Sequence, residues 1–275
     1  MKLKAILAAM AISLTASAQT LPIGDVPLAQ ITQQPGFSGI LHTWGFIGDS
    51  LSSGEFESNN ADGSHGYNDM YEYSWGQCMC RANGTTGDNY SQGGETASGW
   101  IEHFWDNPNN RNNNICAKDD PKQAYIIALG VNDRNLGVEP GNPETDINLG
   151  DYTKNAQTFA GNYGGIIQRV KSIQPDAKIF VVTPARDGND WREFPDVIRK
   201  MADIFTNVYV IDLAKHSPDY SPGSNFHSNF YMGGHLNAAG YMYTSWIMMN
   251  YIDWIIRHNM ADFAQAAYIG TDLRF

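Results

Sequence analysis

Two short segments of the chain carry the residue types of a serine nucleophile and its base. Ser50 ends a Gly-Asp-Ser turn that follows an apolar run, and His235 follows two glycines ahead of a long apolar segment. A histidine close to a serine hydroxyl can take its proton, which makes the hydroxyl a nucleophile. These residues therefore predict acyl transfer.

Two further segments could stabilise the oxyanion that such a reaction forms. Gly94 lies in a Gly-Gly turn that opens a helix, where free backbone N–H groups are expected, and Asn132 follows another apolar run and offers a side-chain amide. Each segment alone is also typical of a turn or a helix cap. The four segments together, in this order, favour an ester-hydrolysing site.

Short apolar runs alternate with helix-like stretches, which is typical of a parallel sheet covered on both faces. In such sheets ligands bind at the carboxyl ends of the strands, where these four segments begin. Apolar spacing indicates one helix that carries Phe159 and Ile173, one that carries Val197 and Phe205, and a third over residues 237–260. The predicted strands are residues 43–47, 88–91, 125–129, 178–182 and 208–213.

Four long segments rich in Gly and Asn connect these elements, and we interpret them as loops of functional or family-specific importance. No repeat or linker divides the chain, so residues 19–275 are expected to form one domain. The four segments are residues 52–69, 107–114, 134–150 and 217–234.

The first 18 residues have the pattern of a signal peptide. Lys2 and Lys4 precede an apolar stretch at residues 5–14, and Ala16-Ser17-Ala18 offers small residues for cleavage. We therefore expect an exported protein, periplasmic or extracellular, without a membrane anchor. The net charge is −11 for the whole chain. A surface this acidic argues against nucleic acid as a partner.

The three cysteines do not indicate a metal site. Cys78 and Cys80 lie two positions apart on a predicted helix, about 200° around it, so they cannot both face one ion. Buried thiols, or one bridge from this pair to Cys116, are the two interpretations. Asp62 and Asp69 could bind calcium, but their spacing matches no recognised site. We expect neither a metal nor a cofactor.

The four segments resemble the blocks of the GDSL, or SGNH, family of serine hydrolases, and the resemblance spans residues 48–241. It implies a flavodoxin-like three-layer α/β/α fold with a mostly parallel five-stranded sheet. It also implies that Ser50 is the nucleophile and His235 the general base and acid. The N–H groups of Ser50 and Gly94, with the amide of Asn132, would form the oxyanion hole.

One position departs from the family pattern. The family usually has an Asp three residues before its histidine, and this chain has Met232 there. We expect a backbone carbonyl to orient His235 instead, with a carboxylate from elsewhere, such as Asp219, as the alternative. Asp212 is expected to be structural. Asp49, next to the nucleophile, is expected to accept loop N–H groups rather than to transfer protons.

Two other enzyme classes fit less well. An α/β-hydrolase needs Gly-x-Ser-x-Gly, and Ser52 stands where the second glycine would be. No Gly-rich phosphate-binding motif indicates a nucleotide. The non-enzymatic alternative is a secreted glycan-binding domain of the same fold that has lost turnover.

The loops suggest the class of substrate. Trp and Tyr stack on sugar rings, and Asn side chains bond hydroxyl groups, so we expect a neutral, hydrophilic partner: a small-molecule or glycan ester. Hydrolysis of short acetyl esters on a saccharide is the leading prediction. A lipase or thioesterase that acts on acyl lipids is the alternative.

Overall fold

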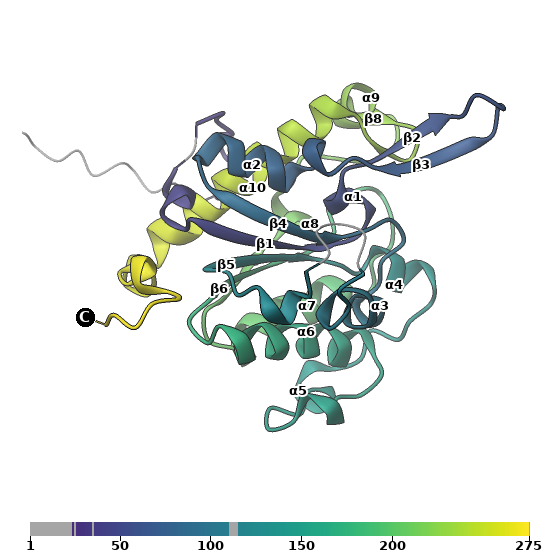
Figure 1. The fold of residues 1–275 in the computed structure, drawn as a ribbon. Helices are drawn as coiled ribbons and strands as arrows, with labels where there is room; N and C mark the ends of the chain where they lie inside the picture. Colours follow the sequence, from purple (N-terminus) through teal and green to yellow (C-terminus); the bar gives the residue numbers. More distant parts are fainter. Residues whose placement is uncertain (1–23, 25, 35, 110–114, 275) are drawn as a thin grey trace, which may run out of the picture.

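A parallel five-stranded sheet forms the centre of the molecule (Figure 1). The computed structural model describes residues 24, 26–34, 36–109 and 115–274. The predicted signal segment, residues 1–18, and residues 110–114 of one expected loop lie outside this range. In spatial order the strands are β4 (Thr86–Ser91), β1 (Thr43–Gly48), β5 (Ala124–Ala128), β6 (Lys178–Val182) and β7 (Val208–Ile211). All five predicted strands are thus present, within two residues of their expected ends.

Helices cover both faces of this sheet, which confirms the predicted three-layer fold. One face packs on α2 (Trp75–Asn83), α10 (Ala238–His258) and α11 (Met260–Phe263). The other face packs on α3 (Ala97–Trp100), α6 (Phe159–Ile173) and α7 (Phe194–Ile204). The strand order is that of a flavodoxin-like sheet, and the order in which strands are added reverses between β1 and β5, which are themselves parallel.

Side chains along each strand alternate between the two faces of the sheet, which explains why the sheet needs a helical layer on each face. Trp44 and Phe46 of β1 enter the core under α2 and α10, while Ile47 enters the opposite core. Neighbouring Ile126 and Ile127 of β5 divide in the same way. Burying each such side chain contributes about 1.5–3 kcal/mol, and a single-layer cover would leave half of them in water.

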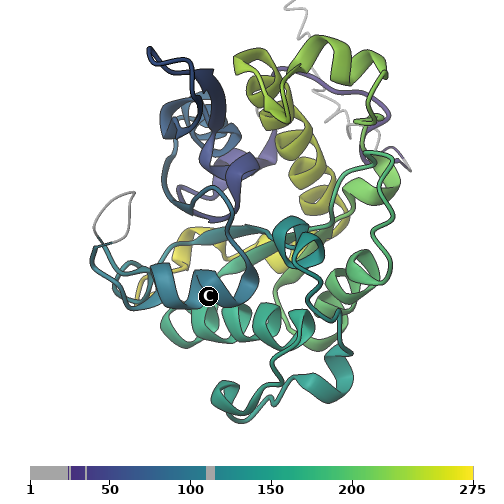
Figure 2. The same cartoon turned by 90° about the vertical axis from the view of Figure 1, so that its right-hand side faces the viewer.

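The segment 52–69, which we expected to be a loop, is largely an antiparallel hairpin. Strand β2 (Glu55–Asn59) pairs with β3 (His65–Asp69), and the hairpin projects from the sheet edge in Figure 1. Figure 2 shows it on the same side of the sheet as α10. The expectation was wrong because a solvent-exposed polar hairpin lacks the apolar alternation that marks a half-buried strand.

The other expected loops also contain short elements. Residues 134–150 include the end of one short helix and the whole of another, and residues 217–234 include a helix and a two-residue strand. The remaining elements are α1 (Ser50–Ser53), α4 (Val131–Asn135), α5 (Pro143–Asp146), α8 (Leu213–His216), α9 (Asn225–Phe230), β8 (Tyr231–Met232) and β9 (His235–Leu236), with 3-10 or π turns at Phe37–Ile40, Tyr71–Tyr73, Ile101–Trp105, Ala117–Asp119, Tyr152–Lys154 and Ala266–Tyr268.

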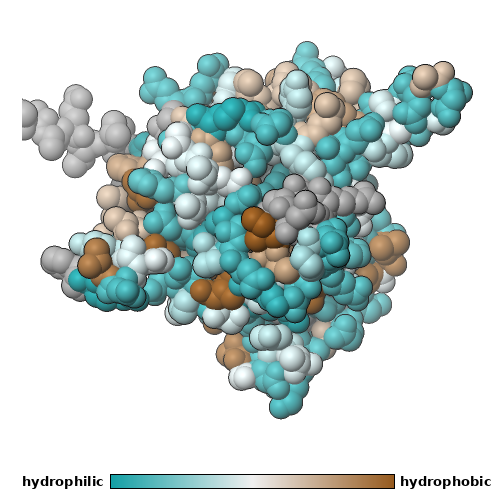
Figure 3. All heavy atoms as spheres, viewed as in Figure 1, coloured by the Kyte–Doolittle hydropathy of each residue, from teal (hydrophilic) through white to brown (hydrophobic). Residues whose placement is uncertain are grey.

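The cysteines are free thiols. The bridge to Cys116, one of the two interpretations, is therefore absent. Cys80 and Cys116 are buried, and Cys78, which lies on the same helix as Cys80, is partly exposed. Among the described residues no cluster of side chains could hold a metal ion. Over the same residues no helix is both long and apolar enough to cross a membrane. The face seen in Figure 3 is mainly hydrophilic, with apolar side chains in small separate areas.

Candidate active site

Three strand ends bring the predicted nucleophile and oxyanion segments together. Gly48 at the end of β1 is in register with Ser91 of β4 on one side and with Ala128 of β5 on the other. The chain therefore leaves all three strands at the same level of the sheet. Ser50, Gly94 and Asn132 follow within a few residues of these ends, so they share one edge.

Ser50 is the first residue of α1, and its position is fixed by caps at both ends. The Asp49 side chain accepts the N–H of Leu51 at 3.0 Å, which confirms the expected scaffolding role. Gly54, with φ 78°, ends the helix in the left-handed region that favours glycine. Burial raises the pKa of Asp49 to about 7, and its second oxygen, Oδ2, has no hydrogen-bond partner.

The predicted oxyanion segments are tied to each other by hydrogen bonds. Asn132 Nδ2 donates to the carbonyl of Glu95 at 3.0 Å, and both carboxylate oxygens of Asp133 accept the N–H of Ala97. Gly94 has φ 77°, which favours glycine in the turn. The structure thus places Asn132 beside the turn that carries Gly94. Their joint role as an oxyanion hole stays a prediction.

His235 is held by a carboxylate that the sequence analysis did not identify. It lies on β9, which pairs with β8 across a tight turn, and its Nδ1 is 2.9 Å from Oε1 of Glu57 on the projecting hairpin. The backbone N–H of Gly234 donates to the same oxygen. The expected carbonyl support is therefore wrong, and a carboxylate takes this position.

The two glycines before His235 make room for this contact. A Cβ atom built at Gly233 would lie 2.1 Å from Glu57 Oε2, and one built at Gly234 would lie 2.9 Å from Oε1. Any larger residue would therefore push the carboxylate away from the imidazole. The Gly-Gly-His sequence is thus complementary to a glutamate that is distant in the chain.

The other carboxylates that the sequence offered are occupied elsewhere. Asp219 accepts the N–H and hydroxyl of Ser221, so it does not support His235. Asp212 is bonded by Arg199 and caps α8, which confirms a structural role. Met232 lies opposite His235 in the β8–β9 ladder and is 44% exposed.

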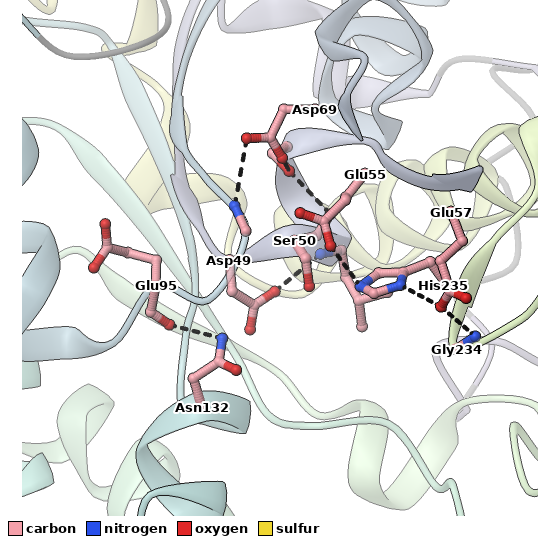
Figure 4. A network of polar contacts seen from close by, with 12 residues as sticks. Asp49, Ser50, Glu55, Glu57, Asp69, Glu95, Asn132, Gly234 and His235 are labelled. Carbon is pink, nitrogen blue, oxygen red and sulfur yellow. Dashed lines mark hydrogen bonds and ion pairs between the residues drawn. The ribbon is translucent and has the colours of Figure 1, made fainter. Parts of the chain in front are cut away.

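A second unexpected carboxylate contacts the other ring nitrogen. Glu55 Oε1 lies 3.0 Å from His235 Nε2. Burial opposes the charged imidazolium, but the hydrogen bonds to Glu55 and Glu57 outweigh it and raise the pKa of His235. The hydrogen bond from His235 in turn lowers the pKa of Glu57. Figure 4 shows both glutamates reaching the imidazole, with Ser50 next to Glu55.

Glu55 and Glu57 could be recognised only with the hairpin in place. Residues two apart on a strand point to the same face, so both glutamates of β2 face β9. The available signal was the Glu-x-Glu spacing directly after the Ser50 helix, together with an Asp-Gly turn that could close a hairpin. Read as a loop, the segment gave no reason to pair them.

The hairpin also brings two rings close to His235. His65 Nε2 lies 3.1 Å from the second oxygen of Glu57, so this carboxylate has a histidine on each side. Tyr67 packs edge-on against His235, with ring centroids 5.8 Å apart, and 60% of the residue is exposed. An exposed aromatic ring beside the imidazole gives the site a surface for substrate contact.

A cavity of about 270 Å³ lies next to the site. Its wall includes Leu51 after Ser50, Val131 before Asn132, and both neighbours of His235, Gly234 and Leu236. The other lining side chains are mainly apolar and aromatic, and they include Trp75, Val182, Leu213, Tyr220 and Met248. The cavity therefore offers an apolar space beside the sequence neighbours of the residues proposed for chemistry.

Comparisons with known proteins support the resemblance. The model of the GDSL-like Lipase/Acylhydrolase family matches residues 46–243, and no curated protein matches the chain. Among solved structures, a family two carbohydrate esterase from Clostridium thermocellum in complex with cellohexaose is 16% identical, with a TM-score of 0.52, covering 80% of this chain and 65% of that one.

Another solved structure illustrates the same fold. A protein from Lactobacillus plantarum is 14% identical, with a TM-score of 0.53, covering 78% of this chain and 97% of that one. At these identities the likeness describes the fold.

Proposed function

The chain belongs to the GDSL-like lipase/acylhydrolase family and is a serine hydrolase of carboxylic esters, and on this premise we propose that Ser50, His235 and Glu57 form its catalytic group. The observation that carries the proposal is the 2.9 Å contact between Glu57 and Nδ1 of His235. A carboxylate on Nδ1 fixes the tautomer in which Nε2 can accept a proton and stabilises the imidazolium that results.

The reaction follows from these roles. The Ser50 hydroxyl attacks the ester carbonyl carbon while His235 Nε2 takes its proton, and the new oxyanion is bonded by the N–H groups of Ser50 and Gly94 and by the Asn132 amide. The Asn132 amide nitrogen carries two N–H donors: one is bonded to the Glu95 carbonyl at 3.0 Å, and the second is the one assigned to the oxyanion. His235 then gives its proton to the leaving alcohol, and water releases the acid in a second, equivalent cycle.

For the leaving group we propose a saccharide in an exported setting. The support is the exposed Tyr67 ring next to His235, the acidic net charge of −11, and the signal-like start of the chain. A neutral sugar stacks on such a ring without needing a positive surface. The structurally similar esterase from Clostridium thermocellum, whose own complex contains cellohexaose, adds to this support.

The cavity favours a second candidate for the acyl group. An acetyl group needs little space, whereas about 270 Å³ with an apolar wall suits a longer acyl chain. A lipid ester or thioester would place its chain there and its carbonyl at Ser50. The two candidates differ in the acyl chain, which makes them separable.

The test compares p-nitrophenyl acetate with p-nitrophenyl octanoate, and an acetylated with an unacetylated cello-oligosaccharide, using the purified chain and Ser50→Ala. Higher kcat/KM for acetate with acetate release from the sugar supports the saccharide ester. Higher kcat/KM for octanoate supports the acyl lipid instead. Turnover that survives in Ser50→Ala contradicts the proposed catalytic group, and sugar binding without turnover by the parent supports a binding domain.

A further inference from the structure

The carboxylate of Glu55 holds the ring nitrogen that the proposed reaction needs. Its Oε1 is 3.0 Å from Nε2 of His235, while Glu57 Oε1 is 2.9 Å from Nδ1. A neutral imidazole carries one N–H, so only the imidazolium can donate to carboxylates on both sides. An imidazolium has no lone pair with which to take a proton from Ser50. The arrangement seen here is therefore unable to begin acylation.

We propose that Glu55 is a positioning residue that restrains His235 in the resting enzyme and must release Nε2 before Ser50 can be activated. The inference rests on the proposed function, because it takes Ser50 as nucleophile and His235 as base. On release, the Nε2–H bond breaks, its proton passes to a water molecule or buffer base, and the electron pair stays on Nε2. The imidazole is then neutral and able to accept the serine proton.

Glu55 is held firmly in this position. Its backbone carbonyl accepts the hydroxyl of Tyr241 from α10 at 2.6 Å, and only 10% of its side chain is exposed. The other carboxylate oxygen faces the oxyanion turn, because a Cβ atom built at Gly93 would lie 1.9 Å from it. The carboxylate thus lies between the imidazole and the turn that carries Gly94. An ester that binds at this turn meets Glu55 directly.

The charges around His235 set the direction of its pH dependence. Burial disfavours the imidazolium, but the two glutamates prevail and raise the pKa of His235 above its usual value. Activity that needs the neutral ring therefore rises as the pH increases through this raised pKa. Removing one negative charge moves the rise to lower pH. The titratable groups that face this site are Asp49 after β1, Glu55 and Glu57 on β2, His65, Tyr67 and Asp69 on β3, and Tyr241 on α10.

The test is the pH profile of kcat/KM for p-nitrophenyl acetate, from about pH 5 to about pH 9, in the parent and in Glu55→Gln. Glutamine keeps the size of the side chain and removes its charge. We expect the rising limb of the profile to move to lower pH by roughly half to one unit. At a fixed pH on this limb, kcat/KM then increases about three- to tenfold, while its plateau value stays within about twofold of the parent value. Glu139→Gln, an exposed glutamate outside the site, is the matched control.

Two results would contradict the proposal that Glu55 restrains His235. An unmoved limb would mean that Glu55 does not hold Nε2 in solution, and a loss of activity at every pH would mean that Glu55 assists the reaction. Glu55→Asp is a second variant, which keeps the charge but shortens the side chain by one methylene. It is expected to shift the limb less than glutamine, and a larger shift would contradict the charge-based explanation.

A titration of His235 by NMR in a Ser50→Ala background separates this inference from the proposed function, because it needs no turnover. Adding Glu55→Gln is expected to lower the pKa of the imidazole by roughly half to one unit. If the parent hydrolyses no ester but this pKa falls, the proposed function fails and the contact of Glu55 with Nε2 stands. If ester is hydrolysed and the pKa does not fall, only the proposed restraint by Glu55 is contradicted, and the proposed function stands.

Discussion

The two sides of the candidate site are built by different means. On the nucleophile side, Ser50, Gly94 and Asn132 each follow a parallel strand whose end is fixed by register with its neighbour. On the histidine side, His235 depends on side chains of the projecting β2–β3 hairpin, and its contact with Glu57 joins residues 178 positions apart. Backbone pairing places one side, and a cluster of charged side chains places the other.

This difference has an energetic consequence. Backbone hydrogen bonds of the sheet are shared among many residues, so one substitution leaves the strand ends where they are. The histidine cluster consists of a few partly buried charges that satisfy one another, and removing one partner leaves another charge uncompensated. We therefore expect the nucleophile side to be robust in structure and the histidine side to be sensitive in both charge and pH.

The largest effect is expected at the proposed nucleophile and its base, one on each side of the site. Ser50→Ala and His235→Ala should each lower kcat for p-nitrophenyl acetate by at least about 10⁴-fold, since the nucleophile or its base is removed. Circular dichroism should show an unchanged fold. Ser228→Ala, an exposed serine on α9, serves as control. If either variant retains a tenth of the parent rate, the two sides do not work as one site.

Asn132→Ala tests the nucleophile side alone. Loss of one oxyanion donor is expected to reduce kcat by about 10²–10³-fold with a smaller change in KM. The strand ends remain in register in this variant, so the loss of rate is caused by weaker hydrogen bonding to the transition state. Asn135→Ala on the same helix, an exposed position, should behave as the parent. Equal rates for the two variants would remove Asn132 from the oxyanion hole.

His65→Ala tests the outer part of the histidine cluster. His65 contacts Glu57 at 3.1 Å and its side chain is 47% exposed, so water screens its interaction with the carboxylate. We expect a two- to fivefold fall in kcat and little change in thermal stability. His42→Ala, an exposed histidine before β1, is the control. A fall as large as that of His235→Ala would mean that His65 takes part in proton transfer.

Met232→Asp is expected to give the smallest effect, although it restores the usual residue of the family. Glu57 already occupies Nδ1 of His235, and the residue at 232 is 44% exposed, so a new carboxylate there adds little. kcat should stay within about twofold of the parent. A rise of tenfold or more would indicate that Glu57 is a poor substitute for the missing aspartate.

The same contrast explains what could be predicted from the sequence. Strand ends carry local signals, namely an apolar run followed by Gly-Asp-Ser or Gly-Val-Asn, so the sheet and the place of Ser50 and Asn132 followed from residue order. Asp49 was assigned correctly for the same reason, since its bond to Leu51 is local. Helices α6 and α10 were marked by apolar spacing over many turns.

The carboxylates of the histidine side carried no such signal. Glu57 and His235 come together only when the hairpin folds over the β8–β9 turn, and neither segment indicates the other by its own residues. The absence of an aspartate at Met232 correctly raised the question of what holds His235. The answer required the three-dimensional position of a segment that had been interpreted as a loop.

The most direct test of the central claim is kcat for p-nitrophenyl acetate in Glu57→Gln, measured beside His235→Ala. If Glu57 orients His235, the glutamine variant keeps its fold and loses about 10²-fold or more of the parent rate, because the amide no longer stabilises the imidazolium. Adding Met232→Asp to this variant should then restore part of the rate. A Glu57→Gln enzyme within twofold of the parent would contradict the account.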